Sequence, residues 1–405
     1  MQSQLDRVQS ALNDLKQGKM VILTDDEHRE NEGDLVFPAE KITPEIMNFM
    51  IREGSGIVCL ALTTEQVKKL KLPPMVPPSE NTSFVNTPFT VSIDAKDVSG
   101  VSASDRVKTI QIAINDHAKP DDLARPGHIF PLQAKNGGVF ERQGHTEGSV
   151  DLLRLAGLKP AAVICEIMNE DGTMARGKQL EAFAAKHHIK MLSVNDIIAY
   201  RLSTENLIAD EASTTLPLEN YGTFTMTVIK EKYNNEEHII LKKEPVNTSQ
   251  PTLVRIHSSC STGDLFASQR CDCHRELHYA LHQISEQGGI LIYLKQEGRG
   301  IGLFNKVKAY ALQEQGLDTV QANEQLGLPV DARQYYIAAT ILRHHDIKQV
   351  RLLTNNPDKI SDLKKYGIKD VIHEAMPVFH NEHNLHYLIT KKEKLNHSIN
   401  FDVID

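Results

Sequence analysis

Apolar positions in the first half of the chain alternate between helical spacing and short continuous runs. Leu5, Val8, Leu12 and Leu15 recur at the spacing of one helical face, which predicts a helix over residues 5–17. Short apolar runs bounded by polar residues are typical of buried strands, and they occur at residues 20–23, 57–62, 90–93, 161–167 and 190–193. Helical patterns separate these runs at residues 43–52, 104–116, 146–156 and 179–186. The alternation predicts an α/β fold of mixed α+β layers for the first half.

The second half shows a similar alternation after a polar stretch. Residues 204–220 are polar and without clear periodicity, so we expect a linker at 204–214 between domains at 1–203 and 215–405. Strands are predicted at residues 224–229, 238–242, 289–294 and 350–353, and helices at 276–286, 303–313 and 333–343. This is again an α/β pattern. The two halves do not resemble each other, which indicates two separate functions on one chain.

Composition and charge limit the classes of function. A chain of 405 residues suggests about two or three domains. The net charge of -8 argues against a nucleic-acid binder, and no apolar stretch is long enough to span a membrane, so we expect neither partner. Five cysteines are an odd number, and three of them are clustered, which argues against a disulfide framework. The expected compartment is therefore reducing and cytoplasmic.

Three of the five cysteines lie close together in the second half, at Cys260, Cys271 and Cys273. Three thiolates fill three corners of the tetrahedron around zinc and leave the fourth corner for water, which is typical of catalytic zinc. The surrounding Arg, His, Ser and Thr side chains suit phosphate. The pattern predicts a metal hydrolase that acts on a phosphorylated substrate.

An acidic loop at residues 25–34 follows the first predicted strand. Its carboxylates, with Arg29, can bind a divalent ion and a phosphate together. An isolated acidic run is more often a solvated loop. Two Arg-X-Gly-His patterns, at residues 125–128 and 142–145, favour a site instead, because each places a cation and an imidazole beside a glycine.

Residues 1–200 resemble 3,4-dihydroxy-2-butanone 4-phosphate synthases through segments 26–34, 99–106, 125–131 and 142–147. The resemblance implies that ribulose 5-phosphate is converted to the four-carbon phosphate and formate, with magnesium or manganese, in a homodimer. It implies metal ligands at Glu30 and His145, and catalytic roles for His128 and Glu166. The implied contacts with ribulose 5-phosphate are Arg29, Glu30, Asp34, Arg142, Gln143, Gly144, His145, Thr146 and Glu166.

Residues 215–398 resemble GTP cyclohydrolase II through segments 255–258, 262–266, 270–273, 296–302 and 353–357. The resemblance implies zinc on the three cysteines, Mg²⁺ on the GTP phosphates, and attack of zinc-bound water on C8 of guanine, with release of formate and diphosphate. It implies that Asp331 accepts a proton and that Arg333 acts at the α-phosphate, where a permanently charged guanidinium suits clamping. The implied GTP contacts are Arg255, Ile256, His257, Ser258, Ser259, Glu276, Glu297, Gly298, Arg299, Thr319, Thr354 and Lys359.

The chain departs from the cyclohydrolase pattern around its cysteines. Ser259 replaces the usual Glu or Gln, Ser261 replaces Leu, His274 replaces Gly, and Glu276 replaces a Gln that contacts GTP. Glu276 would bring negative charge near the nucleotide, and His274 could occupy the open position on zinc.

Together the two halves resemble the bifunctional riboflavin biosynthesis enzyme, which is the leading interpretation. One alternative is that only the ribulose 5-phosphate half is active, with the zinc half reduced to a scaffold or regulator. Another is a zinc-stabilised module that binds nucleic acid or protein.

Overall fold

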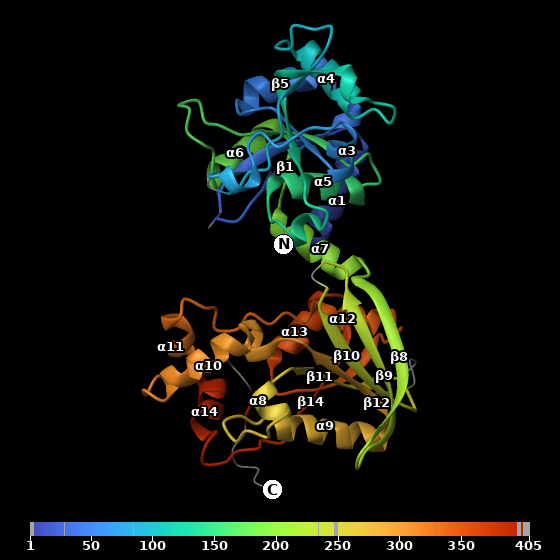
Figure 1. Ribbon diagram of the computed structural model, residues 1–405, viewed down its shortest axis with the longest axis vertical. Helices are drawn as coiled ribbons and strands as arrows, with labels where there is room; N and C mark the ends of the chain where they lie inside the picture. The colour runs from blue at the N-terminus through green and yellow to red at the C-terminus, as the bar shows by residue number, and fades with distance from the viewer. Residues whose placement is uncertain are drawn as a thin grey trace. The chain divides into compact units, whose positions relative to one another are not determined.

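The computed structural model describes residues 4–27, 29–83, 85–233, 235–246, 250–394 and 398–399 (Figure 1). The chain divides into two compact units, Met1–Arg201 and Leu202–Asp405. Each unit contains its own mixed sheet, with helices packed against it. Both halves are therefore α/β, as the sequence predicts.

The first unit, over the residues described, forms a seven-stranded sheet in the order β4-β5-β3-β6-β2-β1-β7. Its strands are β1 (Val21–Thr24), β2 (Gly33–Pro38), β3 (Cys59–Leu62), β4 (Ile93–Ala95), β5 (Leu123–Gln133), β6 (Ala161–Glu166) and β7 (Lys190–Ser193). Its helices are α1 (Gln4–Lys16), α2 (Pro44–Phe49), α3 (Thr64–Lys69), α4 (Ala103–Ala113), α5 (His145–Leu155), α6 (Lys178–His187) and α7 (Val194–Thr204), the last of which ends in the second unit.

Side chains from the central strands of this sheet alternate between two hydrophobic cores. Ile22 packs in one core with residues of α2, α3, α4 and α6, whereas Val21 and Leu23 pack in the other with residues of α1, α5 and α7. Leu35 and Val36 of β2 divide in the same way. Because successive strand residues point to opposite faces, a sheet covered on both faces needs apolar residues at every position. This requirement explains the continuous apolar runs in the sequence.

The second unit, within its described residues, forms a seven-stranded sheet in the order β14-β13-β11-β12-β10-β9-β8. Its strands are β8 (Ile208–Leu218), β9 (Gly222–Glu231), β10 (Glu237–Lys243), β11 (Thr252–Ser258), β12 (Gly289–Leu294), β13 (Gln349–Leu353) and β14 (Asp370–Glu374). Its helices are α8 (Ser261–Asp264), α9 (Cys273–Gln287), α10 (Gly302–Gln313), α11 (Thr319–Gln325), α12 (Tyr336–His344), α13 (Pro357–Lys365) and α14 (Leu385–Lys394).

Strands β14, β13, β11 and β12 run parallel, and β11 marks a change in the direction of winding. The chain passes from β11 through α9 to β12 on one side of β11, and later returns to β13 on its other side. Helix α9 lies on one face of this sheet, and α12 and α13 lie on the other (Figure 1). Ligand sites of α/β sheets form where the winding changes, outside the carboxyl ends of the strands. Cys260 follows the carboxyl end of β11 directly.

Most predicted elements are confirmed, often within one residue, including α1, β1, β6, β7 and β12. The linker predicted at 204–214 is wrong over most of its length, because residues 208–218 form β8 and pair with β9. Strand β8 lies at the edge of the sheet and most of its side chains are exposed, so its sequence lacks the apolar alternation that would predict a strand. The helix predicted from residue 333 begins at Tyr336, which leaves Asp331 and Arg333 in the preceding loop.

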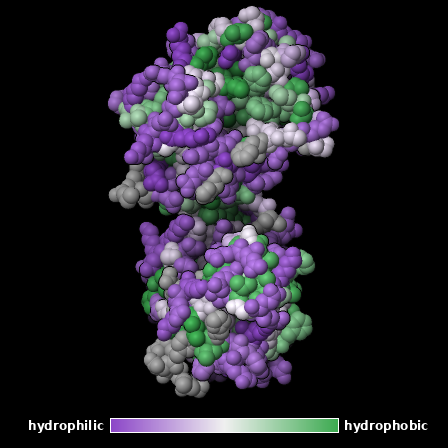
Figure 2. All heavy atoms as spheres, turned by 90° about the vertical axis from the view of Figure 1, so that its left-hand side faces the viewer, coloured by the Kyte–Doolittle hydropathy of each residue, from purple (hydrophilic) through white to green (hydrophobic). Residues whose placement is uncertain are grey.

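The visible surface is largely hydrophilic, and Figure 2 shows hydrophobic residues gathered in part of the upper unit. The exposed large hydrophobic side chains of the first unit include Ile57, Met75, Val76 and Val101. No helix in the described part of the chain is long and apolar enough to cross a membrane.

Candidate active sites

The predicted acidic site of the first unit forms where several strand ends meet. Asp25 follows β1, Asp34 lies near the start of β2, and Glu166 ends β6. Asp34 and Glu166 are direct neighbours across the antiparallel β2–β6 pair. His145 is the first residue of α5, and its side chain reaches the same place. Residues far apart in the sequence thus meet at one edge of the sheet.

Asp25, Glu30 and His145 form a group whose ligand atoms all lie within 4.8 Å of one another. His145 Nδ1 is 3.6 Å from Glu30 Oε2, and His145 Nε2 is 3.9 Å from Asp25 Oδ1. The His145 Nε2 and Asp34 Oδ1 atoms are buried without a hydrogen-bond partner among the described residues. Buried polar atoms are rarely unpaired, so these two atoms are suited to binding a ligand. Glu30 and His145 were predicted as metal ligands, whereas Asp25 was not singled out.

The electrostatics of this group favour a bound cation. Burial raises the pKa of Asp34 to about 7. Burial alone would lower the pKa of His145, but the carboxylates of Asp34, Glu30 and Asp25 outweigh it and raise the pKa to about 9. Protons therefore compensate the clustered carboxylates when no metal is bound. An oxygen-rich group with one imidazole suits Mg²⁺ or Mn²⁺, which can replace those protons.

A pocket opens beside this group. Two arginine side chains bring positive charge to the pocket. Arg29 pairs with Asp25 at 2.8 Å, and Arg142 pairs with the buried Glu147 at 2.7 Å. The predicted substrate residues Arg29, Glu30, Asp34, Arg142, His145, Thr146 and Glu166 all line the pocket. Gln143 and Gly144 do not line it, although a Cβ at Gly144 would meet Arg142 Nη1 at 2.4 Å.

His128 is separate from this pocket within one chain. Its Nδ1 lies 2.7 Å from Asp94 Oδ2, and its backbone N–H donates to the other oxygen of Asp94 at 3.0 Å. Asp94 therefore fixes the imidazole, while the side chain of His128 stays 46% exposed. The role of Asp94 had no clear sequence signal, because it lies outside the segments that carry the resemblance.

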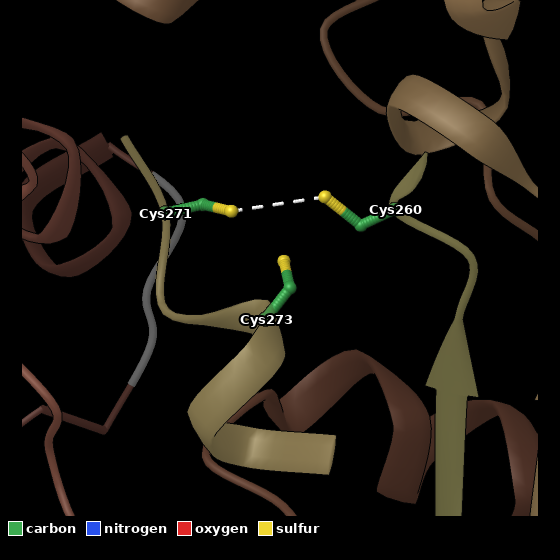
Figure 3. A group of neighbouring side chains, drawn as sticks. All are labelled: Cys260, Cys271 and Cys273. Carbon is green, nitrogen blue, oxygen red and sulfur yellow. Dashed lines mark hydrogen bonds between the residues drawn. The ribbon is translucent and has the colours of Figure 1, made fainter. Parts of the chain in front are cut away.

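The three cysteines of the second unit converge as predicted. Cys260 lies after β11, Cys271 in the loop before α9, and Cys273 in the first turn of α9, with their sulfurs pointing toward one another (Figure 3). The Sγ atoms of Cys260 and Cys271 are 3.7 Å apart. Two sulfurs on a tetrahedral zinc at ~2.3 Å would be separated by about 3.8 Å, so the spacing fits zinc ligation and is far too long for a disulfide.

Charge at the cysteines also indicates a metal. The pKa of Cys260 is lowered because the other two thiols, Cys271 first, and the Lys306 ammonium group donate to its sulfur. The pKa of Cys271 rises in turn to about 12. A divalent cation would favour the thiolate form of all three cysteines. Gly263 makes room, since a Cβ there would lie 3.0–3.1 Å from the sulfurs of Cys271 and Cys260.

A pocket that includes all three cysteines in its lining lies in the second unit. Of the predicted GTP contacts and catalytic residues, Ser258, Ser259, Gly298, Arg299, Thr319 and Arg333 line it. Six further predicted GTP contacts do not line the pocket: Arg255, Ile256, His257, Glu276, Thr354 and Lys359. All of these except Glu276 are buried in the protein. Lys359 Nζ, for example, donates to Ile256 O at 2.8 Å.

Two arginines supply positive charge to the zinc pocket. Arg299 Nη1 and Nη2 are buried without a hydrogen-bond partner in the described part of the structure. Its backbone has φ +60°, a strained conformation for a side-chain-bearing residue that is typical of functional sites. Arg333 pairs with Asp331 through two hydrogen bonds of 2.9 and 3.1 Å from its Nε. Burial would raise the pKa of Asp331, but Arg333 outweighs burial and lowers it.

The carboxylate of Glu276 pairs with two cationic side chains inside the protein. Its Oε2 lies 2.5 Å from Arg255 Nη2, and its Oε1 lies 3.8 Å from Lys391 Nζ. Burial would raise the pKa of Glu276, but Lys391 and Arg255 outweigh burial and lower it. The negative charge that Glu276 introduces is therefore compensated inside the protein.

The other departures have separate structural consequences. Ser261 donates from its N–H and its hydroxyl to Glu297 Oε2, both at 2.6 Å, and Lys306 Nζ holds Glu297 Oε1 at 2.8 Å. Glu297 is thus engaged within the protein and does not line the pocket. The ring of His274 contacts that of His278, with centroids 4.2 Å apart and the planes tilted by 46°, and His274 is not in the cysteine group among the described residues. Nothing in this arrangement places His274 at the open zinc position.

Several pocket residues escaped the sequence analysis. Lys306 and Tyr310 lie four residues apart on α10, so both face the cysteines from one side of a helix. That spacing was visible in the sequence as Asn-Lys-X-X-X-Tyr. Tyr387 also lines the pocket, but it comes from α14, more than a hundred residues after the cysteines, and carried no local signal. Cys59 and Cys165 are buried thiols of the first unit, and Cys59 also borders the first pocket.

Family comparisons agree with the two sites. The family model of 3,4-dihydroxy-2-butanone 4-phosphate synthase matches residues 9–200, and that of GTP cyclohydrolase II matches residues 209–377. Riboflavin biosynthesis protein RibBA of Bacillus mycoides is 52% identical over 97% of this chain and 99% of its own length. The chain belongs to the RibBA family. Riboflavin biosynthesis protein RibBA of a Synechocystis strain is 50% identical over 97% of this chain and 71% of its own length.

Membership of the RibBA family makes the chain a bifunctional riboflavin biosynthesis enzyme, both a lyase and a hydrolase. It converts ribulose 5-phosphate to 3,4-dihydroxy-2-butanone 4-phosphate and formate. It also converts GTP to 2,5-diamino-6-ribosylamino-4(3H)-pyrimidinone 5′-phosphate, formate and diphosphate. The single-activity alternative is not favoured. One solved structure that matches is RibBX of A. baumannii, described as a two domain 3,4-dihydroxy-2-butanone 4-phosphate synthase. It is 35% identical to this chain and superimposes with a TM-score of 0.66. The match covers 92% of this chain and 100% of the RibBX chain.

Proposed function

We propose that the two reactions occur in the two pockets described above. The observation that carries this proposal is that each unit has one preformed ligand group beside a pocket lined by arginine: Asp25, Glu30 and His145 in the first unit, and the three cysteines in the second. Mg²⁺ or Mn²⁺ suits the first group, and Zn²⁺ suits the second.

In the first pocket, ribulose 5-phosphate binds with its phosphate toward Arg29 or Arg142 and its hydroxyl groups toward the carboxylates. Glu30 and His145, with Asp25 beside them, would hold the divalent ion, which would supply positive charge against the sugar oxygens. Proton abstraction next to the carbonyl needs a base, and Asp34 and Glu166 are adjacent carboxylates in the pocket. Ile57 N–H donates to Glu166 Oε2 at 2.8 Å and so orients that carboxylate.

In the second pocket, GTP places guanine C8 near the cysteines and its phosphates toward Arg299 and Arg333. Cys260, Cys271 and Cys273 would hold Zn²⁺, which would lower the pKa of a water for attack on C8, and Mg²⁺ would offset charge on the phosphates. Arg299 offers donors that are unpaired in the protein, and Arg333 stays protonated and clamps the α-phosphate. Asp331 does not line the pocket; it accepts hydrogen bonds from Arg333, which lowers its pKa and orients the guanidinium, and its proposed role as proton acceptor rests on the family resemblance.

Isotopic labelling tests the assignment of two reactions to one chain. We expect the purified protein, given GTP labelled with ¹³C at C8 together with unlabelled ribulose 5-phosphate, to release labelled and unlabelled formate at once. NMR spectroscopy distinguishes the two products. Labelled formate alone, or unlabelled formate alone, would contradict a second active pocket.

We also propose a homodimer in which a second copy supplies His128 to the first pocket. His128 lies outside that pocket in its own chain, yet it is held in position by Asp94. Exposed apolar side chains lie near both His128 and the pocket. Val101 is exposed and follows Gly100, where a Cβ would contact His128. Ile57 is also exposed, and its backbone N–H donates to Glu166 of the pocket. A subunit interface over these residues would bury them. We place the enzyme in the cytoplasm, since its five cysteines are all free thiols.

Mixed dimers test this arrangement. Glu30→Gln and His128→Ala chains, each inactive alone, are expected to recover part of the ribulose 5-phosphate activity when co-expressed, because one of the two shared sites is then intact. Glu30→Gln mixed with Glu166→Gln is the matched control and should not recover, since both residues belong to the same chain's half of the site. Absence of recovery in the first mixture would contradict the shared site.

A further inference from the structure

Helix α14 belongs to the zinc pocket although the cyclohydrolase family match ends before it. The match stops at residue 377, and α14 spans Leu385–Lys394. Its Tyr387 nevertheless lines the same pocket as Cys273, Arg299 and Arg333. Helix α14 therefore contributes to the pocket from outside the stretch that the cyclohydrolase family model matches.

Buried contacts fix α14 against the zinc loop. Lys391 Nζ lies 2.9 and 3.0 Å from the two carboxylate oxygens of Asp272, which stands between two of the cysteines. Leu388 is fully buried. Asn384, just before the helix, accepts from Asn381 N–H at 2.7 Å and donates to Phe379 O at 2.9 Å. The helix is thus docked by charge, packing and hydrogen bonds rather than laid over the surface.

Tyr387 contacts the unpaired guanidinium of the pocket. The Cζ atom of Arg299 lies 5.5 Å from the centroid of the Tyr387 ring, within the range of a cation–π contact. Both Nη atoms of Arg299 are buried and lack hydrogen-bond partners among the described residues. An aromatic face holds the cation without using its N–H donors, which stay available to an anion.

We infer that Tyr387 is a positioning residue that holds Arg299 for the phosphate groups of the nucleotide, and that α14 forms part of the nucleotide site. This inference rests on the proposed binding of GTP in the zinc pocket. The aromatic ring is the feature that matters, because the contact with Arg299 is made to the ring. The phenol stays neutral, since burial raises the pKa of Tyr387 to about 12.

Steady-state kinetics with GTP separate the ring from the hydroxyl. Tyr387→Leu keeps apolar bulk but removes the ring, and it is expected to raise the KM for GTP on the order of tenfold while kcat changes little. Tyr387→Phe retains the ring and should stay within about twofold of wild type. Glu393→Gln, at an exposed position on the same helix, is the matched control and should behave as wild type. Zinc content and ribulose 5-phosphate turnover confirm that each variant is folded.

A double-mutant cycle with Arg299→Met tests whether Tyr387 acts through Arg299. The KM of the double variant should match that of Arg299→Met, because the ring has no guanidinium left to position. Fully multiplicative effects, or a KM for Tyr387→Leu within about twofold of wild type, would overturn the inference.

These experiments distinguish failure of the Tyr387 role from failure of the proposed GTP reaction. If Arg299→Met weakens GTP use and Tyr387→Leu does not, the pocket assignment stands and the role of Tyr387 fails. If the zinc-bound wild-type protein does not turn over GTP, calorimetric titration with GTP still compares wild type with Tyr387→Leu. Equal dissociation constants would overturn the inference in that case as well.

Discussion

Replacing Cys271 by serine is expected to lower formate release from GTP by roughly 10³-fold or more while leaving ribulose 5-phosphate turnover unchanged. Serine removes one thiolate from a group in which two sulfurs already stand 3.7 Å apart. A neutral hydroxyl is a poor zinc ligand, so the metal and the water that it activates are lost together. The two sites lie in different units, which is why the effect should be confined to GTP.

Formate release from each substrate and zinc content per chain measure this effect in the same sample. Cys165→Ser is the matched control, because Cys165 is a buried thiol of the first unit and belongs to no group of metal ligands in the described residues. We expect that variant to keep its zinc and its GTP turnover. A Cys271→Ser protein that lacks zinc yet retains more than about a tenth of the GTP turnover would exclude zinc as the source of the activity.

Replacing Glu30 by glutamine is expected to lower ribulose 5-phosphate turnover by about 10²–10⁴-fold and to spare GTP turnover. Glutamine has nearly the same shape, so the change removes a charge without leaving a cavity. Glu30 belongs to a group of three candidate ligand residues with Asp25 and His145, and the metal affinity of this group depends on its carboxylates.

The matched control is Glu45→Gln, a glutamate in the first turn of α2 that is exposed and far from any ligand group in sequence. It should leave both activities unchanged. Titration with Mn²⁺, followed by electron paramagnetic resonance, measures metal binding in the same variants. Wild-type Mn²⁺ affinity in Glu30→Gln, together with turnover above about a tenth of normal, would show that Glu30 is not a metal ligand.

The amphipathic and continuous apolar runs predicted the two α/β units well, because these patterns follow directly from burial. Ile22 and Val21 face different cores, so their run had to be apolar throughout. Strand β8 could not be predicted in this way, since its position at the sheet edge imposes no burial pattern. Its stability comes from pairing with β9, which a local sequence pattern does not reveal.

Residues of the candidate sites were predictable where they lie in dense motifs, such as Glu30, His145 and the three cysteines. Their internal pairing was not, because it depends on residues distant in the sequence. The charge of Glu276 is compensated by Arg255 and Lys391, and the latter comes from the C-terminal helix. Tyr387 was missed for the same reason: its position in the pocket is a consequence of how α14 docks.

The most direct test of the account is stepwise return of metals to metal-free protein, with formate measured from each substrate. The account predicts that Mg²⁺ alone restores formate release from ribulose 5-phosphate, and that release from GTP returns only when zinc is also bound. Protein that binds zinc and releases formate from ribulose 5-phosphate but none from GTP would contradict the two-reaction account.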